Sequence, residues 1–366
     1  MRALFNLVFE LLSLGIGLWV WAVVWRSFYT YTAQIGDEVH RVRFKAARDG
    51  EEWTIALTRY RPRGDGPSRN QSVVCCSGLG ANHFTFDLTS QSSMALAFAE
   101  KGFDVWLLDL RGHGFSEKHG WLFGPRKTPW EFDDYLADEL PAAFAYIEKI
   151  TGRARMHWVG HSMGGLLLYA WLATRGGERI ISGVTLGSAL EYPQSETAFA
   201  RLLKVESGLR MLKFIPLRWL SAAVSPFTAR WDGSPVDRFN FNPRIMPARL
   251  ARMLLANVLE DIPVRLLVQL KSALGPGGLT PVGGDGKPYL DKLAGIHARV
   301  LAVAGTADEQ VSPSAVRKTV ETMAGGGEYR EVKDFGHFDL VIGQAAREKV
   351  WPQVMDWLLS GPPKQA

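Results

Sequence analysis

One short stretch of the chain, residues 160–164, has the residue types and spacing of an activated nucleophile. It reads Gly-His-Ser-Met-Gly, and a serine flanked by glycines can occupy a strained turn between a strand and a helix. The apolar residues 156–159 precede this stretch, and the helix-like residues 165–171 follow it. The sequence therefore predicts a strand, a sharp turn and a helix that together present the Ser162 hydroxyl.

An acid and a base follow the serine along the chain. Residues 299–305 are an apolar run that ends at glycine, which predicts a buried strand with Asp308 in the loop just after it. His337 lies in a later loop, behind a short strand predicted over residues 328–333. A serine hydroxyl is a poor nucleophile until an imidazole takes its proton, and a carboxylate can fix the tautomer of that imidazole. We therefore expect Ser162, Asp308 and His337 to form a catalytic triad.

Two other carboxylates, Asp334 and Asp339, lie closer to His337 in sequence and are rival partners for its ring. Neither of them follows a buried strand as Asp308 does. Functional loops of α/β sheets lie at the carboxyl ends of strands, so we expect Asp308 rather than Asp334 or Asp339 to be the partner of His337.

Several stretches besides the serine motif resemble the serine α/β-hydrolase superfamily, and the chain order serine, aspartate, histidine is the order of that superfamily. These stretches are residues 77–80, 109–116, 130–142, 305–308 and 336–340. Residues 130–142 and 336–340 resemble the acid-lipase and polyhydroxyalkanoate-synthase branch. The synthases carry cysteine where this chain has Ser162, which favours hydrolysis over polymerisation. The resemblance implies an α/β-hydrolase fold: a mostly parallel central sheet flanked by helices, with a helical cap insertion.

The same resemblance implies where the oxyanion of a tetrahedral intermediate would bind. Members of the superfamily supply two backbone N–H groups, one from the residue after the nucleophile and one from the loop after the third strand. Here these residues are Met163 and Leu79. The sequence has no metal-ligand spacing of His, Cys and carboxylate residues and no phosphate-binding glycine loop, so we expect neither a metal nor a cofactor.

The N-terminal segment is mostly apolar. Residues 3–25 are long enough to span a bilayer as a helix, and their tryptophans lie toward one end, as in an interfacial belt. We expect residues 1–30 to form a single-pass membrane anchor, with a helix that lies in the interface or packs on the protein as the alternative. More Arg and Lys residues follow this segment than precede it, which favours a cytoplasmic catalytic domain.

Composition fits one catalytic domain with an anchor. The chain has 366 residues, of which 47% are hydrophobic, and a formal net charge of +5, which is too modest to indicate nucleic acid binding. Its two cysteines, Cys75 and Cys76, are adjacent in a predicted strand, where side chains alternate between faces. They cannot form an ordinary disulfide, so the chain needs no oxidising compartment. No pattern indicates the oligomeric state.

A long insertion separates two predicted strands in the second half of the chain. Crossovers in such sheets are normally short, which predicts a cap over the active site. We expect core segments over residues 38–187 and 296–360, with a helical cap over 188–295. Residues 199–231 of this cap are rich in Leu, Phe, Trp, Arg and Lys, which is typical of a helix that binds a membrane surface. A cap whose leucines pack on the core is the alternative.

These observations predict a membrane-anchored carboxylic ester hydrolase, a lipase or esterase, that acts through an acyl-enzyme. Its expected partners are an apolar small-molecule or lipid ester and membrane lipid. An acyltransferase with the same acyl-enzyme is an alternative, because the sequence does not show whether water accepts the acyl group. A non-catalytic binding protein on the same scaffold would have a broken triad, whereas Ser162, Asp308 and His337 are all present.

Overall fold

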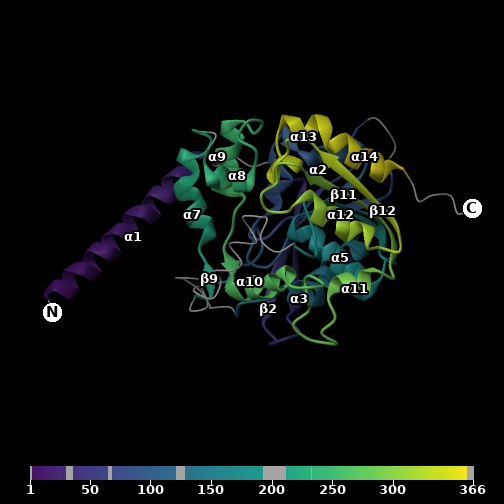
Figure 1. The fold of residues 1–366 in the computed structure, drawn as a ribbon, viewed down its shortest axis with the longest axis horizontal. Helices are drawn as coiled ribbons and strands as arrows, with labels where there is room; N and C mark the ends of the chain where they lie inside the picture. Colours follow the sequence, from purple (N-terminus) through teal and green to yellow (C-terminus); the bar gives the residue numbers. More distant parts are fainter. Residues whose placement is uncertain are drawn as a thin grey trace, which may run out of the picture.

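A computed structural model describes residues 2–29, 36–64, 68–120, 128–192, 212–231 and 233–360 of the chain. At its centre is a sheet of eight strands in the order β1-β2-β6-β3-β7-β8-β11-β12 (Figure 1). The strands are β1 (Glu38–Lys45), β2 (Glu52–Tyr60), β3 (Ser72–Cys76), β6 (Asp104–Asp109), β7 (Met156–His161), β8 (Ile180–Leu186), β11 (His297–Gly305) and β12 (Gly325–Val332). The pairs β1–β2 and β2–β6 are antiparallel, and the other neighbours are parallel.

Helices cover both faces of this sheet, which is why strands such as β3, β6 and β7 are buried along their whole length. The first face carries α4 (Leu140–Thr151), α5 (Met163–Arg175) and α12 (Pro313–Glu321). The second face carries α2 (Met94–Glu100), α13 (Gln344–Lys349) and α14 (Trp351–Leu359). Cys76 belongs to the core of the first face and Cys75 to that of the second, and both thiols are free. The predicted mostly parallel sheet with flanking helices is confirmed.

Shorter elements connect these layers and form the edges of the molecule. In the core segments they are η1 (His83–Thr85), β4 (Asp87–Thr89), β5 (Ser92–Ser93), α3 (Phe132–Asp134), η2 (Tyr135–Glu139) and η6 (Phe338–Leu340). Between β8 and β11 they are β9 (Phe214–Ile215), α7 (Leu217–Val224), η4 (Ser225–Phe227), α8 (Pro235–Asn240), α9 (Ala248–Asn257), β10 (Ile262–Pro263), α10 (Val264–Leu270), η5 (Lys271–Leu274) and α11 (Tyr289–Leu293). This second set corresponds to the expected helical cap, whose exact boundaries stay a prediction.

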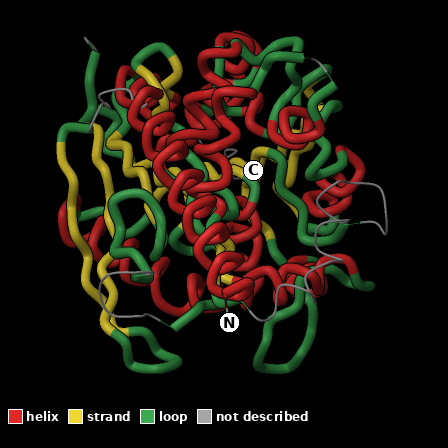
Figure 2. Tube along the Cα trace, turned by 90° about the vertical axis from the view of Figure 1, so that its left-hand side faces the viewer, coloured by secondary structure: helices red, strands yellow, loops and turns green. Residues whose placement is uncertain are grey.

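The cap does not bury all of its apolar side chains. In the segment predicted to bind a membrane surface, residues 199–211 lie outside the described residues. In the described remainder, α7 buries Ser221 and Ala222 but exposes Leu220 and Val224. Figure 2 shows the molecule from the side of α1, with helices over the centre of the view and strands toward its margin.

The N-terminal helix α1 (Arg2–Tyr29) projects from the body, with its C-terminal end beside α7 and α9 (Figure 1). In the part of the chain that the structure describes, no helix is both long and apolar enough to cross a membrane. The prediction of a membrane-spanning helix over residues 1–30 is therefore not supported. The apolar stretch of α1 lies between two charged residues, Glu10 and Arg26. It is therefore shorter than the roughly 20 residues that a helix needs to span a bilayer.

Candidate active site

The residues predicted to be catalytic lie on loops that leave the carboxyl ends of three parallel strands. Ser162 follows β7, Asp308 follows β11 and His337 follows β12. These strands are parallel within one sheet, so their carboxyl ends share one edge. That edge is the usual place for a functional site in an open α/β sheet.

Ser162 occupies the turn between β7 and α5 with φ 52° and ψ −119°, a backbone conformation that residues other than glycine rarely adopt. Hydrogen bonds hold this turn: the Ser162 N–H donates to the Leu186 carbonyl at 2.8 Å, and the Ser162 carbonyl accepts from the Gly165 N–H at 2.9 Å. The side chain is partly exposed, unlike most of its surroundings. Strain that persists because neighbouring structure enforces it is typical of functional positions.

The two glycines of the serine motif are required by close approach of the backbone. A Cβ on Gly160 would lie 2.3 Å from the Gly164 carbonyl oxygen. A Cβ on Gly164 would lie 2.1 Å from the carbonyl oxygen of Cys76, at the end of β3. Any side chain at either position would push the strand and helix apart. The structure thus has the strand, turn and helix that the sequence predicts around Ser162.

Asp308 and His337 form a buried hydrogen-bonded pair. Nδ1 of His337 lies 2.7 Å from Oδ2 of Asp308. The other carboxylate oxygen, Oδ1, accepts the backbone N–H groups of Gln310 at 2.8 Å and Val311 at 3.0 Å. A Cβ on Gly187 would lie 3.1 Å from both Oδ2 of Asp308 and Nδ1 of His337, so this glycine leaves room for the pair. A carboxylate fixed at both oxygens holds the imidazole in one orientation and keeps its proton on Nδ1.

His161 joins the nucleophile turn to the loop that carries His337. The two ring centroids are 4.6 Å apart, and Nε2 of His161 donates to the His337 carbonyl oxygen at 3.2 Å. Burial, and next the nearby His337, lower the pKa of His161 well below its usual value, so its ring is neutral. A neutral His161 thus connects the loop of His337 to the residue before Ser162 without adding a charge to the site.

The loop after β3 passes close to the nucleophile. A Cβ on Gly78 would lie 2.9 Å from the Ser162 Cβ and 3.4 Å from its Oγ. Leu79 follows Gly78 in this loop, and Met163 is the first residue of α5, where backbone N–H groups have no partner within the helix. Both residues predicted to supply oxyanion donors therefore adjoin Ser162, one in sequence and the other through Gly78.

A connection between this loop and the cap was not predicted from the sequence. Nδ2 of Asn82 donates to Oε1 of Glu260 at 3.0 Å, and the Glu260 N–H donates to the Gly80 carbonyl at 2.7 Å. The Glu260 side chain is buried and forms an ion pair of 3.1 Å with Nζ of Lys118. The cap therefore holds the loop of Leu79 through Gly80 and Asn82.

A second buried histidine–carboxylate pair lies behind the same loop, and neither of its members was predicted as a site residue. Nδ1 of His83 lies 2.6 Å from Oδ2 of Asp109. Asp109 also accepts the backbone N–H groups of His83 and Phe115, both at 2.9 Å. Burial alone would raise the pKa of Asp109, but His83 and these hydrogen bonds hold it below its usual value. Nε2 of His83 is buried and has no hydrogen-bond partner among the described residues.

The rival carboxylates near His337 have other surroundings. Asp334 is exposed, in a turn with φ 66°. Oδ2 of Asp339 accepts the backbone N–H groups of Asn242 at 2.6 Å and Gly336 at 2.8 Å, so this carboxylate connects the His337 loop to the cap. Burial raises the pKa of Asp339 to about 7. The carboxylate bonded to Nδ1 of His337 is that of Asp308.

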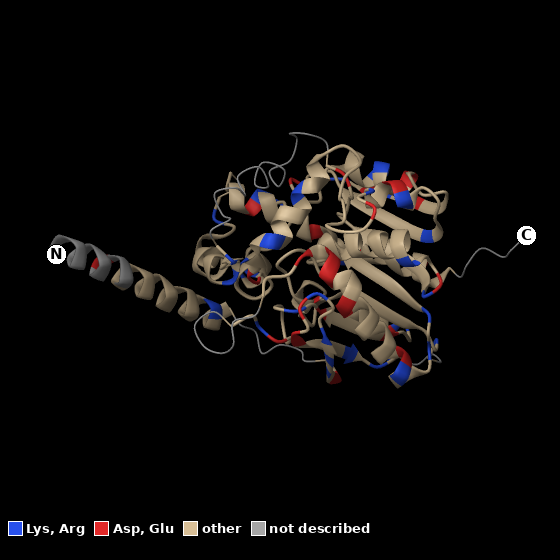
Figure 3. Cartoon of the chain, turned by 90° about the horizontal axis from the view of Figure 1, so that it is seen from below, with Lys and Arg blue, Asp and Glu red and all other residues tan. Residues whose placement is uncertain are grey.

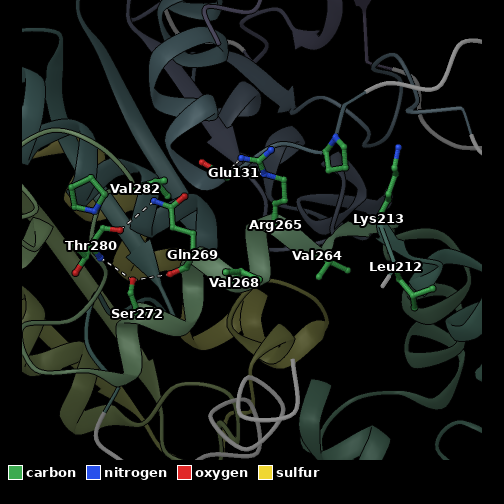
Figure 4. A pocket seen from close by; sticks show the side chains of 12 residues that line it. Glu131, Leu212, Lys213, Val264, Arg265, Val268, Gln269, Ser272, Thr280 and Val282 are labelled. Carbon is green, nitrogen blue, oxygen red and sulfur yellow. Dashed lines mark hydrogen bonds and ion pairs between the residues drawn. The ribbon is translucent and has the colours of Figure 1, made fainter. Parts of the chain in front are cut away.

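A cavity of about 690 Å³ lies between α10, the loop over residues 280–282 and the start of the described cap, and its lining includes none of the three predicted catalytic residues. Figure 4 shows Ser272 and Thr280 at one end of it and Lys213 at the other. Among the residues with described positions, no group of three or more His, Cys, Asp and Glu side chains is placed to hold a metal ion.

Sequence comparisons agree with this arrangement. Residues 71–246 match the family model described as alpha/beta hydrolase fold. A stretch of 116 residues is 33% identical to triacylglycerol lipase 2 of Arabidopsis thaliana and covers 31% of this chain and 27% of that lipase. A longer match of 308 residues is 20% identical to lipase member N of Mus musculus and covers 75% of each chain. The stretch that is 33% identical thus spans about a quarter of the plant lipase.

Solved structures with the same fold include enzymes that act on esters. A monoacylglycerol lipase of Paleococcus ferrophilus superposes with a TM-score of 0.57 at 18% identity, over 84% of this chain and 98% of that one. An esterase of Thermogutta terrifontis gives a TM-score of 0.55 at 14% identity, over 87% and 98%. At these low identities the structural similarity shows only the fold. The sequence matches show in addition that the chain is similar to lipases. Residues 71–246 thus match the family model of the α/β-hydrolase fold, and the chain is similar to lipases and esterases with this fold.

Proposed function

We propose that this protein hydrolyses carboxylic esters, as a lipase or esterase, through an acyl-enzyme formed on Ser162. The observation that carries the proposal is the buried pair of Asp308 and His337 on the sheet edge that also holds the strained turn of Ser162. The similarity to lipases supports an ester as the substrate class. The chemistry needs no cofactor.

In the proposed reaction, Oγ of Ser162 attacks the carbonyl carbon of the ester while Nε2 of His337 takes the hydroxyl proton. His337 then gives this proton to the leaving alkoxide, which departs as an alcohol and leaves an acyl-serine. Asp308 keeps Nδ1 protonated and stabilises the imidazolium that forms. A water molecule deprotonated by His337 then attacks the acyl carbon, the bond to Oγ of Ser162 breaks, and His337 returns the proton to Oγ as the carboxylic acid leaves.

The negative charge that develops on the carbonyl oxygen needs donors that are in place before the reaction. We assign this role to the backbone N–H groups of Leu79 and Met163, on either side of Ser162. Loss of one such donor typically costs about 2.7–4 kcal/mol of transition-state stabilisation. Because these are main-chain groups, substitution of the Leu79 or Met163 side chain would not remove them.

We further propose an apolar or lipid ester as the substrate and association with membrane lipid through α1. The support for both is the apolar character of the exposed part of α1, which contacts the cap rather than the sheet. The proposed division has a core over residues 38–187 and 296–360, a cap over 188–295 and a membrane-associated helix within residues 1–30. A cytoplasmic location of the core stays a prediction from the distribution of positive residues.

Hydrolysis of p-nitrophenyl esters of increasing acyl length by the full chain in detergent would test the proposal. We expect turnover by the wild-type protein and a loss of kcat of about a million-fold in Ser162→Ala, because the nucleophile is removed. Ser188→Ala is the matched control: Ser188 is buried near the same turn and its Oγ donates to the Leu186 carbonyl at 3.2 Å. We expect this variant to keep its activity within a few-fold.

Two outcomes would overturn the proposed function. One is unchanged turnover in Ser162→Ala, which would exclude the acyl-serine. The other is a folded wild-type protein that turns over no ester of the series. Addition of a second alcohol would separate hydrolysis from acyl transfer, because a transferase would form the new ester in preference to the acid.

A further inference from the structure

The exposed part of α1 is apolar on all of its sides. Leu14, Ile16 and Leu18 are 61%, 63% and 55% exposed, and Val20 is 47% exposed. Successive residues of an α-helix are rotated by about 100°, so these positions point in several directions around the axis. A protein partner covers one stripe of a helix, whereas a helix that is apolar all round belongs in a protein core or in lipid. Figure 3 shows this part of α1 without charged residues up to its C-terminal end.

The cap continues this apolar surface. Nε1 of Trp21 donates to the Ala223 carbonyl at 2.9 Å, and its ring stacks on that of Phe227 with centroids 6.2 Å apart. Trp19 contacts Trp219 with centroids 6.1 Å apart. These contacts fix α7 and η4 beside the C-terminal third of α1, where the helix meets the body.

Three exposed apolar side chains of the cap lie on α7 and η4, the elements that make these contacts. Leu220 is 54% exposed, Val224 38% and Phe227 47%. Together with Leu14, Ile16 and Leu18 they define what we call the α1–cap surface. Its two parts come from segments about 200 residues apart in sequence, as the hydrogen bond between Trp21 and Ala223 shows.

Arginines border the α1–cap surface on the side of the protein body. The guanidinium of Arg218 lies 5.2 Å from the Trp219 ring, and that of Arg230 lies 5.7 Å from the Phe227 ring. Arg26 is at the C-terminal end of α1, and burial together with Arg218 lowers its pKa to about 10, which leaves it charged at neutral pH. Aromatic rings beside positive side chains are typical of the level at which a protein meets lipid headgroups.

We propose that the α1–cap surface inserts into one leaflet of a lipid membrane, so that the cap itself contacts lipid and the protein is not held away from the membrane on a tether. Trp21 precedes Arg26 by five residues, which corresponds to about 7.5 Å along a helix. If Arg26 is at the headgroups, Phe227 beside Trp21 is already in the acyl region. The inference rests on the membrane association of α1 proposed above and extends it to the cap.

Two variants of the full chain, each with one added surface cysteine, would test this proposal: Leu18→Cys on α1 and Val224→Cys on the cap, each labelled with an environment-sensitive fluorophore. The native Cys75 and Cys76 are fully buried and would not react in the folded protein. Ile150→Cys is the matched control, because Ile150 is 41% exposed but lies at the end of α4 in the core.

On addition of phosphatidylcholine–phosphatidylglycerol vesicles, we expect a blue shift at both Leu18→Cys and Val224→Cys and none at Ile150→Cys. A shift at position 18 alone would overturn the cap contact and leave the anchor standing. No shift at either position would overturn both. A shift that needs no vesicles and grows with protein concentration would show that a second copy covers the surface, which also overturns the proposal.

A substitution provides a second, independent measurement. Phe227→Asp should weaken vesicle co-sedimentation about ten-fold, because an apolar side chain is replaced by a charge at the lipid contact. Val282→Asp is the control: Val282 is 61% exposed on a loop of the cap that does not belong to the α1–cap surface. Turnover of a short-chain ester in detergent shows that each variant is folded. Equal binding by the two variants would contradict the proposal.

Discussion

The molecule contains two buried histidine–carboxylate pairs whose local geometry is nearly the same. The His337–Asp308 pair has an N···O distance of 2.7 Å, and the His83–Asp109 pair one of 2.6 Å. In both pairs the carboxylate lies at or just past the end of a central strand and also accepts two backbone N–H groups. The N···O distance, the burial of the side chains and the hydrogen bonds of the carboxylate therefore do not show which of the two pairs is catalytic.

The surroundings of the second ring nitrogen separate the two pairs. The ring of His83 packs against Phe84 and Phe115, with centroids 4.2 and 4.6 Å apart, and its Nε2 is buried with no partner in the described structure. His337 packs against His161, the neighbour of the partly exposed Ser162. A histidine–carboxylate pair becomes a candidate for catalysis only where the far nitrogen can reach a reacting group. The other pair is a structural brace.

The largest contrast is expected in kcat. Asp308→Asn should lower kcat for ester hydrolysis by about 10⁴-fold, because the amide favours the wrong tautomer of His337 and cannot stabilise its imidazolium. The free energy of unfolding should also fall, because breaking a buried pair from one side typically costs about 3–5 kcal/mol, so kcat is compared on the folded fraction. Steady-state kinetics with a p-nitrophenyl ester and urea unfolding of the same sample would measure both. A fall in kcat below ten-fold would remove Asp308 from the proposed mechanism.

The second pair should lose stability without a comparable loss of kcat. Asp109→Asn removes the charge that faces His83, and breaking a buried pair from one side typically costs about 3–5 kcal/mol. We expect a loss of this size in the free energy of unfolding, measured in urea. For the fraction that remains folded, kcat should fall by less than about ten-fold, because Asp109 does not touch the substrate. A loss of kcat as large as that of Asp308→Asn, with normal stability, would show that the brace has a catalytic role.

The candidate nucleophile, acid and base stand out in the sequence because each has a local signature. The glycines around Ser162 are needed because the backbone there leaves no room for a Cβ. Asp308 follows an apolar run that forms the mostly buried strand β11. His337 lies in the loop after the next strand. Such features can be recognised in the sequence because a strand, a turn and a helix are each specified by residues close together in the chain.

The brace and the cap contact have no such signature. Asn82 and Glu260 are 178 residues apart, and His83 and Asp109 are 26 residues apart across a helix and a strand. Only the folded sheet brings their segments together, so no periodicity or motif relates them. The apolar N-terminal residues predicted a membrane span, but the pattern alone did not reveal that α1 packs on the cap through Trp21.

Asp339 extends the comparison to a buried carboxylate without an imidazole partner. Its pKa is raised to about 7 by burial, against about 4 in an unfolded chain. Between these values the folded protein keeps a proton that the unfolded chain has lost, so the free energy of unfolding falls as the pH rises from about 4 to about 7, by at most about 1.4 kcal/mol per pH unit.

Asp339→Asn should remove this part of the pH dependence, because the amide does not titrate. Urea unfolding of both proteins across the same pH range would measure it. The stability of the wild-type protein relative to the variant should decline through the window and be constant outside it. A difference that is the same at all pH values would contradict the assignment.

The smallest expected effect concerns Glu260, a residue of the cap that holds the loop of Leu79. Glu260→Gln keeps an oxygen that can accept from Asn82 but removes the charge beside Lys118, so the loop of Leu79 should loosen without losing its fold. We expect kcat to fall about five-fold with KM nearly unchanged, because oxyanion donors act mainly in the transition state. Glu148→Gln, which breaks a surface ion pair of 2.8 Å with Arg179, is the control and should leave both constants unchanged. An effect confined to KM would mean that Glu260 shapes the substrate pocket rather than the oxyanion loop.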